Sequence, residues 1–222
     1  MTYDIVIIGT GWHAREVLDV LEAMNAERPR YRPLGFLDDA PERHGVEVRG
    51  LPVLGGVDWI HQRADGGLHY VLGIGAPSAR YQVTARLSGA GRAARPLVHP
   101  TSLVGRDVAL GEGSVLTAGT ILTTAIRVGR HVHLNLAATV SHDCELGDYA
   151  ILAPGTHLAG NVRLGEGCEV GLGAVVLQGV AIGEWTVVGA GAVVNRALPS
   201  NATAVGVPAR VIKQRSPGWH LA

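Results

Sequence analysis

The chain has little of several features that would place it in familiar protein classes. Two cysteines in 222 residues provide no disulfide framework. Lys plus Arg and Asp plus Glu each total 19, so the formal net charge is zero and neither nucleic acid nor an anionic membrane is a predicted partner. No run approaches the ~20 apolar residues of a membrane helix. The start carries an acid at Asp4 and no basic segment, so we expect no secretion signal and predict a cytoplasmic protein.

Aromatic residues are also scarce, at 5%, whereas glycine is abundant, with 31 residues. Such a composition favours tight layers of small aliphatic side chains and argues against a disordered chain. The length allows one large domain or two small ones.

Residues 1–95 alternate between apolar runs and helical patterns. The run "DIVIIG" is fully apolar and ends in glycine, as a buried parallel strand should. Strands are predicted at 4–9, 33–39 and 70–75, and helices from Ala14 onward and over 76–91. These elements predict a small α/β domain, half the size of a Rossmann fold, with helical crossovers.

Residues 96–222 follow a different period. Every sixth residue from Val98 to Val194 is Val, Leu or Ile, seventeen positions without an exception, and glycine often follows. A mostly small second series lies two residues before each aliphatic. This repeat predicts short strands, three to a coil, with successive coils ~4.8 Å apart. The C-terminal part is therefore predicted to be an all-β parallel β-helix.

The stretch "TVSHDCELGDYA" contains His142, Asp143 and Cys144 in a row. Cys144 falls in the small inward series, as does Cys168, and their 24-residue separation is not a whole number of coils. We therefore expect two packed core cysteines, with neither a disulfide nor a nucleophile. His142 and Asp143 fall at a turn just past an inward valine. A histidine suits general-base chemistry, and a carboxylate on its other nitrogen fixes the tautomer.

The hexad pattern resembles the hexapeptide repeat of left-handed β-helix acyltransferases. The segments "IIGTGWHAREVLDVL", "FLDD" and "GVPARVIK" resemble more narrowly the nucleotide-sugar and sialic-acid acetyltransferases of the PglD/NeuD type, from residue 3 to about residue 213. The resemblance implies a left-handed β-helix and a homotrimer with acetyl-CoA between adjacent β-helices.

The resemblance also implies roles at the turn. His142 corresponds to the family's general base and Asp143 to its acidic partner. Gly160, 18 residues on in "AGN", is implied as the oxyanion donor, supplied by a neighbouring subunit, and as a cofactor contact; a plain turn glycine is the alternative. Asn135 corresponds to an asparagine that orients the histidine or the substrate; a stacked polar residue is its alternative.

The motif "GTGWHA" is typical of a phosphate-binding turn between a strand and a helix. Because residues 1–95 leave no room for a second mononucleotide half, a nucleotide-linked sugar is predicted over NAD. Asp38 and Asp39 are expected to contact a ribose or base, with a simple strand-ending turn as the alternative. The predicted substrate-binding residues are Gly9, Gly11, Trp12, His13, Asp38, Asp39 and Gly75.

The closing "GVPAR" resembles the family's tail motif that lies against CoA, whose phosphates a cation would meet. The predicted cofactor-binding residues are Gly160, Gly206, Pro208, Ala209, Arg210 and Lys213.

Three features leave alternatives open. Trp12 replaces a usual small residue, and Ile151 stands where some family members carry a second active-site histidine, for which His157 is a substitute candidate. The zinc sites of γ-class carbonic anhydrases occur on the same kind of β-helix, and the candidate ligands here are His131, His133, His142 and His157. Because the first two lie at no whole-coil offset from His142, no metal is predicted.

The sequence thus predicts an acetyl-CoA-dependent N-acetyltransferase with His142 as base. Its substrate is predicted to be a nucleotide-linked amino sugar, specifically a 4-amino-4,6-dideoxy sugar. Two alternatives remain, namely O-acetylation of a sialic-acid-like or other sugar hydroxyl, and a non-catalytic nucleotide-sugar-binding scaffold.

Overall fold

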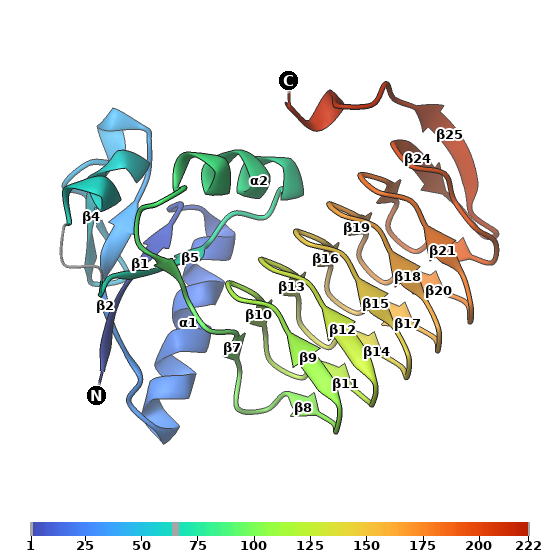
Figure 1. The fold of residues 1–222 in the computed structure, drawn as a ribbon, viewed down its shortest axis with the longest axis horizontal. Coiled ribbons are helices and arrows are strands. Elements are labelled where there is room, and N and C mark those ends of the chain that lie inside the picture. Colours follow the sequence, from blue (N-terminus) through green and yellow to red (C-terminus); the bar gives the residue numbers. More distant parts are fainter. Residues whose placement is uncertain (1, 64–66, 222) are drawn as a thin grey trace.

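The computed structural model describes residues 2–63 and 67–221 (Figure 1). An N-terminal sheet has the strand order β3-β4-β2-β1-β5-β6, parallel except for the β3–β4 hairpin. Its strands are β1 (Tyr3–Ile8), β2 (Tyr31–Leu37), β3 (Glu47–Val48), β4 (Leu51–Gly55), β5 (His69–Leu72) and β6 (Arg92–Ala93). Its helices are α1 (Trp12–Glu27), α2 (Pro77–Arg86) and the short 3-10 turns η1 (Pro41–Arg43) and η2 (Val57–Gln62).

The central strand β1 explains why this sheet is covered on both faces. Ile5 and Ile7 pack against α1, while Val6 and Ile8 pack against the layer that contains η2 and Leu87. The three predicted strands and both predicted helices are present. Strands β3, β4 and β6, which are short or interrupted by glycine and proline, were not predicted, and α2 ends at Arg86 instead of residue 91.

The remaining chain winds into a triangular β-helix, confirming the predicted fold class. Each strand pairs in parallel with the strand 18 residues later, as Leu116, Leu134 and Leu152 do. The first face contains β7 (Leu97–Val98), β10 (Val115–Leu116), β13 (His133–Leu134), β16 (Ile151–Leu152), β19 (Glu169–Val170) and β22 (Val187–Val188). The second contains β8 (Leu103–Val104), β11 (Ile121–Leu122), β14 (Thr139–Val140), β17 (His157–Leu158), β20 (Val175–Val176) and β23 (Val193–Val194). The third contains β9 (Val108–Leu110), β12 (Ile126–Val128), β15 (Glu145–Leu146), β18 (Arg163–Leu164) and β21 (Ala181–Ile182).

The α/β domain packs on the first face of the β-helix. The outward side chains of Leu97 and Val115 join the core formed by α1. Arg80 of α2 is fully buried and donates to the carbonyls of Ile74 and Gly75 and, across the boundary, to those of Tyr149 and Ala150. Burial lowers the pKa of Arg80 to about 9, so the guanidinium is still charged at neutral pH.

The chain closes with a hairpin of β24 (Ala202–Val205) and β25 (Arg210–Gln214), followed by η3 (Trp219–Leu221). This tail returns over α2 (Figure 1). His220 stacks on Trp185 with ring centroids 3.7 Å apart, and its carbonyl accepts a hydrogen bond from Gln82. None of the helices among the described residues combines the length and apolar character needed to span a membrane.

Candidate active site

His142 and Asp143 form the corner between the second and third faces. Nδ1 of His142 lies 2.8 Å from Oδ2 of Asp143, and the two side chains are 50% and 55% exposed. Asp143 adopts φ +59°, a left-handed conformation that Asp tolerates better than most residues. Because the carboxylate only accepts, Nδ1 carries the proton and Nε2 is left as a solvent-accessible acceptor. The corner therefore presents a half-exposed histidine whose Nδ1 is held by a neighbouring carboxylate.

Gly160 lies directly beneath this imidazole, one coil further along. A Cβ atom at Gly160 would be 2.4 Å from Cε1 and 2.5 Å from Nε2 of His142, so only glycine fits under the ring. The backbone here is fixed by the Asn161 N–H, which donates to the His142 carbonyl at 2.9 Å. The Gly160 N–H itself has no acceptor within the described part of the chain. One chain brings His142 and Gly160 together, whereas donation from Gly160 of a neighbouring subunit stays a prediction.

Asn135 lies elsewhere, at the corner between the first and second faces. It is buried, and its amide donates to the carbonyl of Leu152 at 2.9 Å. Within residues 2–63 and 67–221 no hydrogen bond joins Asn135 to His142. This environment matches the alternative role for Asn135, that of a polar residue stacked within the β-helix.

Both cysteines are free and fully buried. The Cys144 thiol donates to the Ala159 carbonyl at 3.2 Å, and the Cys168 thiol to that of Gly183 at 3.3 Å. Burial raises the pKa of both thiols, that of Cys168 to about 12. The prediction of packed core cysteines is confirmed.

The loops after β1 and β5 meet at the carboxyl edge of the N-terminal sheet. Gly9 has φ +101°, and a Cβ there would lie 3.1 Å from the Gly73 carbonyl. Gly11, which caps α1, and Gly75 would meet nothing within 4 Å, so both backbones are open to a ligand. Trp12 is 82% exposed beside them. Gly73 at the start of this second loop is required because a Cβ there would lie 2.6 Å from Ala14 of α1.

The two aspartates after β2 have different surroundings. Asp38 accepts from the Thr10 hydroxyl at 2.5 Å and therefore lies beside the Gly9–Gly11 loop. Asp39 accepts from Arg86 at 2.6 Å and from the Val57 N–H at 2.9 Å, and the Arg86 hydrogen bond lowers the pKa of this carboxyl. Asp39 thus resembles the strand-ending turn, while Asp38 is placed where a ligand of the loop would lie.

His13 contacts a residue that the sequence did not identify as part of this site. Its Nε2 lies 2.5 Å from Nδ1 of His133, and its Nδ1 lies 2.9 Å from Glu16. Burial lowers the pKa of both histidines, that of His133 well below its usual value. The pair links the phosphate-type loop to the first face. No local pattern signals it, because the two residues are 120 positions apart.

The four histidines considered as zinc ligands have separate partners. His131 lies between the rings of Tyr70 and Tyr149, and His157 bonds Thr139 at 2.9 Å. His133 pairs with His13 and His142 with Asp143. Among the described residues, no group of three His, Cys, Asp or Glu side chains is arranged to hold a metal ion.

The "GVPAR" motif forms the turn of the β24–β25 hairpin. Ala209 is buried and its N–H donates to the Val193 carbonyl at 2.8 Å, whereas Arg210 and Lys213 are exposed. Gly206, at φ +97°, and Pro208 shape the turn. These residues cap the last coil, and their cofactor role remains a prediction.

Comparison with known proteins agrees with this architecture. The PglD N-terminal domain family matches residues 4–87. No match was found among curated protein sequences. The structure of PerB from Caulobacter crescentus, in complex with CoA and GDP-perosamine, is 34% identical with a TM-score of 0.85, covering 95% of this chain and 97% of that one.

Two further structures have the same extent of similarity. The acetyltransferase domain of PglB from Neisseria gonorrhoeae, in complex with acetyl coenzyme A, is 30% identical with a TM-score of 0.85, covering 96% of this chain and 100% of that one. WeeI from Acinetobacter baumannii is 30% identical with a TM-score of 0.83, covering 95% and 100%. The chain is therefore an acyltransferase that belongs to the PglD-type family of hexapeptide-repeat sugar acetyltransferases.

Proposed function

We propose that the protein transfers an acetyl group from acetyl-CoA to the amino group of a nucleotide-linked amino sugar of the 4-amino-4,6-dideoxy class. The observation that carries this proposal is the hydrogen-bonded His142–Asp143 pair, whose imidazole packs over Gly160. The similarity to PerB, bound to CoA and GDP-perosamine, supports both the acyl donor and the class of acceptor.

The corner supplies each group that the reaction requires. Nε2 of His142 takes a proton from the sugar amine as the amine nitrogen bonds to the thioester carbonyl carbon. Asp143 holds the Nδ1 proton and stabilises the imidazolium. The Gly160 N–H donates to the oxyanion of the tetrahedral intermediate. When the carbon–sulfur bond breaks, the imidazolium returns its proton to the departing CoA thiolate, and the amide product is released.

The acceptor site requires a second copy of the chain. In a triangular β-helix, the corner between the second and third faces is opposite the first face, on which the α/β domain packs. One chain therefore holds its nucleotide loop and its His142 on opposite sides. A neighbouring copy that places its loop beside this corner completes the site, in which positioning supplies much of the rate.

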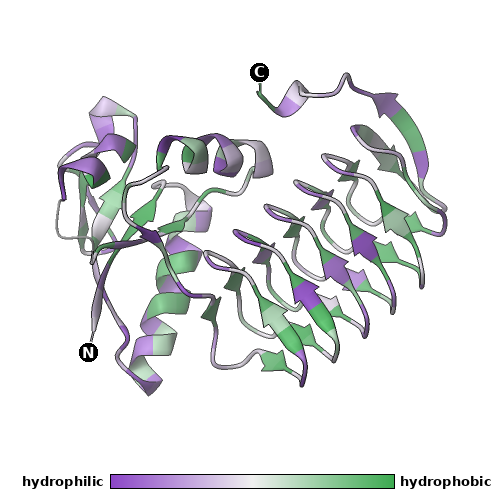
Figure 2. Cartoon of the chain, in the orientation of Figure 1, coloured by the Kyte–Doolittle hydropathy of each residue, from purple (hydrophilic) through white to green (hydrophobic). Residues whose placement is uncertain are grey.

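The second face is the surface that fits such an assembly, which we propose is a homotrimer. Its outward positions are mostly aliphatic and include Leu103, which is 64% exposed, Ile121, Val175 and Val193. The third face instead carries a charged ladder in which Arg127, Glu145 and Arg163 are neighbours (Figure 2). Exposed apolar strips are typical of surfaces between subunits.

Binding residues follow from these positions. The open loop with its neighbours would hold the nucleotide diphosphate, with Asp38 beside it. In such an assembly, the exposed cations Arg210 and Lys213 would meet CoA phosphates. The nucleotide-binding set is Gly9, Gly11, Trp12, His13, Asp38 and Gly75.

The test is CoA thiol release by the purified protein with acetyl-CoA and a panel of UDP-, dTDP- and GDP-linked 4-amino sugars. We expect turnover with one of them and a loss of ~100-fold or more in His142→Ala. No CoA release with any amino sugar, or turnover only with hydroxyl acceptors, would refute N-acetylation. Turnover that survives in His142→Ala would refute His142 as the base.

A further inference from the structure

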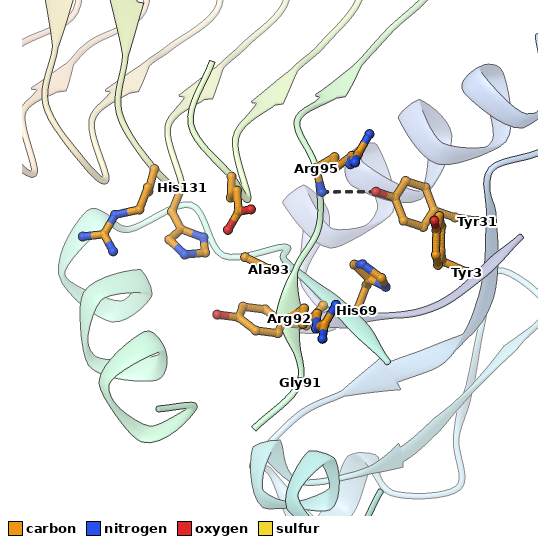
Figure 3. A pocket seen from close by; sticks show the side chains of 11 residues that line it. Tyr3, Tyr31, His69, Gly91, Arg92, Ala93, Arg95 and His131 are labelled. Carbon is orange, nitrogen blue, oxygen red and sulfur yellow. Dashed lines mark hydrogen bonds between the residues drawn. The ribbon is translucent and has the colours of Figure 1, made fainter. Parts of the chain in front are cut away.

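A hollow lies at the amino edge of the N-terminal sheet, on the interdomain boundary (Figure 3). Its volume is about 520 Å³, within the range of small-molecule sites. Because the sheet is parallel, the first residues of its strands converge here, with turns of the β-helix opposite. The side chains that define its chemistry are Tyr3, Tyr31, His69, Arg92, Arg95 and Glu112.

Three rings form one wall. The centroid of the His69 ring lies 5.0 Å from that of Tyr3 and 5.9 Å from that of Tyr31, and the two tyrosine rings are 6.3 Å apart. Tyr31 is buried, and its hydroxyl accepts from the Arg95 N–H at 3.1 Å. His69 donates from Nδ1 to the Gly67 carbonyl at 3.2 Å, leaving Nε2 as an acceptor. The wall is held in place without a ligand.

Cations surround this wall. Arg92 and Arg95 line the hollow, and Arg28 and Arg30 line an adjoining one of about 400 Å³ that shares Tyr3, Tyr31 and Arg95. Among described residues, none of the four guanidinium groups has a side-chain hydrogen bond or ion pair. Arg130, on the far side, is paired with Asp148. The carboxylate within the hollow is that of Glu112, so Arg92 and Arg95 leave the hollow with a net positive charge.

The hollow is separate from the proposed acetyl-transfer site. The Gly9 and Gly75 loops follow the carboxyl ends of β1 and β5, whereas Tyr3 and His69 stand at the amino ends of the same strands. A six-residue strand separates the two edges by about 20 Å. A ligand in one site does not reach the other.

We propose that this hollow binds a small anion carrying a flat ring, of the nucleoside monophosphate class. The Tyr3 ring, which is 43% exposed, stacks on the base, as aromatic side chains do with any base, while His69 and Tyr31 pack against Tyr3. Arg92 and Arg95 bind the phosphate through guanidinium forks. Glu112 accepts from an N–H or O–H of the base or ribose. A volume of about 520 Å³ is of the size that holds a single nucleotide.

The test is calorimetric titration of the full-length protein with AMP, GMP, UMP and CMP, with inorganic phosphate and the matching nucleosides as separate arms. We expect a monophosphate to bind more tightly than phosphate or the nucleoside alone. The double variant Arg92→Gln/Arg95→Gln should weaken binding by about tenfold or more, and Tyr3→Ala by about fivefold. Arg43→Gln, which removes an exposed arginine outside the hollow, is the matched control and should bind normally.

Two arms separate this site from the acetyl-transfer site. His13→Ala, altered at the carboxyl-edge loop, should keep the monophosphate affinity, and the double arginine variant should keep its acetyl-transfer rate and melting temperature. Loss of binding in His13→Ala, unchanged binding in the double variant, equal affinity for bare phosphate, or binding of oligonucleotides alone would each overturn the proposal. These outcomes do not depend on whether an amino sugar is the acceptor.

Discussion

Two histidine pairs lie in contrasting parts of this molecule. His142 and Asp143 are adjacent in sequence, half exposed and held at a corner of the β-helix. His13 and His133 are 120 positions apart and join the two domains in a partly buried contact, with Arg80 nearby bridging the same boundary. In the proposed reaction the exposed pair offers a basic nitrogen to the substrate, whereas the His13–His133 pair holds the loop that follows β1 against the first face.

We expect the His142–Asp143 pair to affect the chemical step, and the contacts at the domain boundary to affect stability and nucleotide binding. A change at the corner should lower turnover and leave the free energy of unfolding nearly unchanged. A change at the domain boundary should lower the free energy of unfolding or weaken binding of the nucleotide, and should leave the rate of the chemical step nearly unchanged. The following predictions test this separation, beginning with the largest expected effect.

Arg80→Met should destabilise the fold by about 3 kcal/mol or more, because charged hydrogen bonds to four carbonyls are lost and the acceptors stay buried. Urea unfolding measures the change. Arg86→Met is the matched control on the same helix, since it removes only exposed ion pairs and should cost less than about 1 kcal/mol. Equal losses in the two variants would contradict the bridging role.

Gly160→Ala should lower kcat by about 100-fold, because the new methyl group occupies the position of the His142 ring and displaces it. The melting temperature should change little. In the double variant His142→Ala/Gly160→Ala, the second substitution should add almost nothing. Additive losses would show that Gly160 acts independently of the ring.

His131→Phe should make the protein less sensitive to acid. Burial lowers the pKa of His131 to about 4, so the folded state favours the neutral ring. The stability due to this histidine is present above pH ~6.5 and is lost as pH falls toward about 4. Between pH 7 and 5, the wild type should lose about 2 kcal/mol more than the variant in urea unfolding. Equal losses of unfolding free energy in the wild type and the variant would contradict the lowered pKa of His131.

Asp143→Asn should lower kcat by about tenfold with KM nearly unchanged, since the amide no longer stabilises the imidazolium. The effect should be smaller than that of removing His142, because the pair is half exposed and water replaces part of the carboxylate's effect. Steady-state kinetics with the acceptor identified by the panel provide the check. A change confined to KM would place Asp143 in substrate binding.

His133→Leu should raise KM for the nucleotide sugar by about three- to tenfold with little change in kcat, because His13 loses its partner beside the loop. A thermal melt controls for the buried substitution. A fall in kcat at constant KM would show that the His13–His133 pair contributes to the chemical step, as the His142–Asp143 pair is expected to do.

Most of the fold was predictable because its signals are periodic. The unbroken series of inward aliphatics fixes the coil length, and that length places Gly160 under His142. The buried contacts of His133 and Arg80 were not predictable, because they depend on how two domains dock and no spacing encodes that. Asp38 and Asp39 are adjacent in sequence, and only their different partners, Thr10 for Asp38 and Arg86 for Asp39, distinguish their surroundings. The aromatic wall at the amino edge joins residues from three separate strands, and no spacing in the sequence predicts it either.

The central claim is that the nucleotide loop of one chain serves His142 of another. Its most direct test is complementation between two inactive variants, His142→Ala and Gly11→Asp, whose added carboxylate at the open loop repels phosphate. Oligomers co-expressed from both should recover about a quarter of wild-type turnover, as random assortment of two half-sites in a symmetric oligomer predicts. Oligomers as inactive as either variant alone would show that each chain completes its own site.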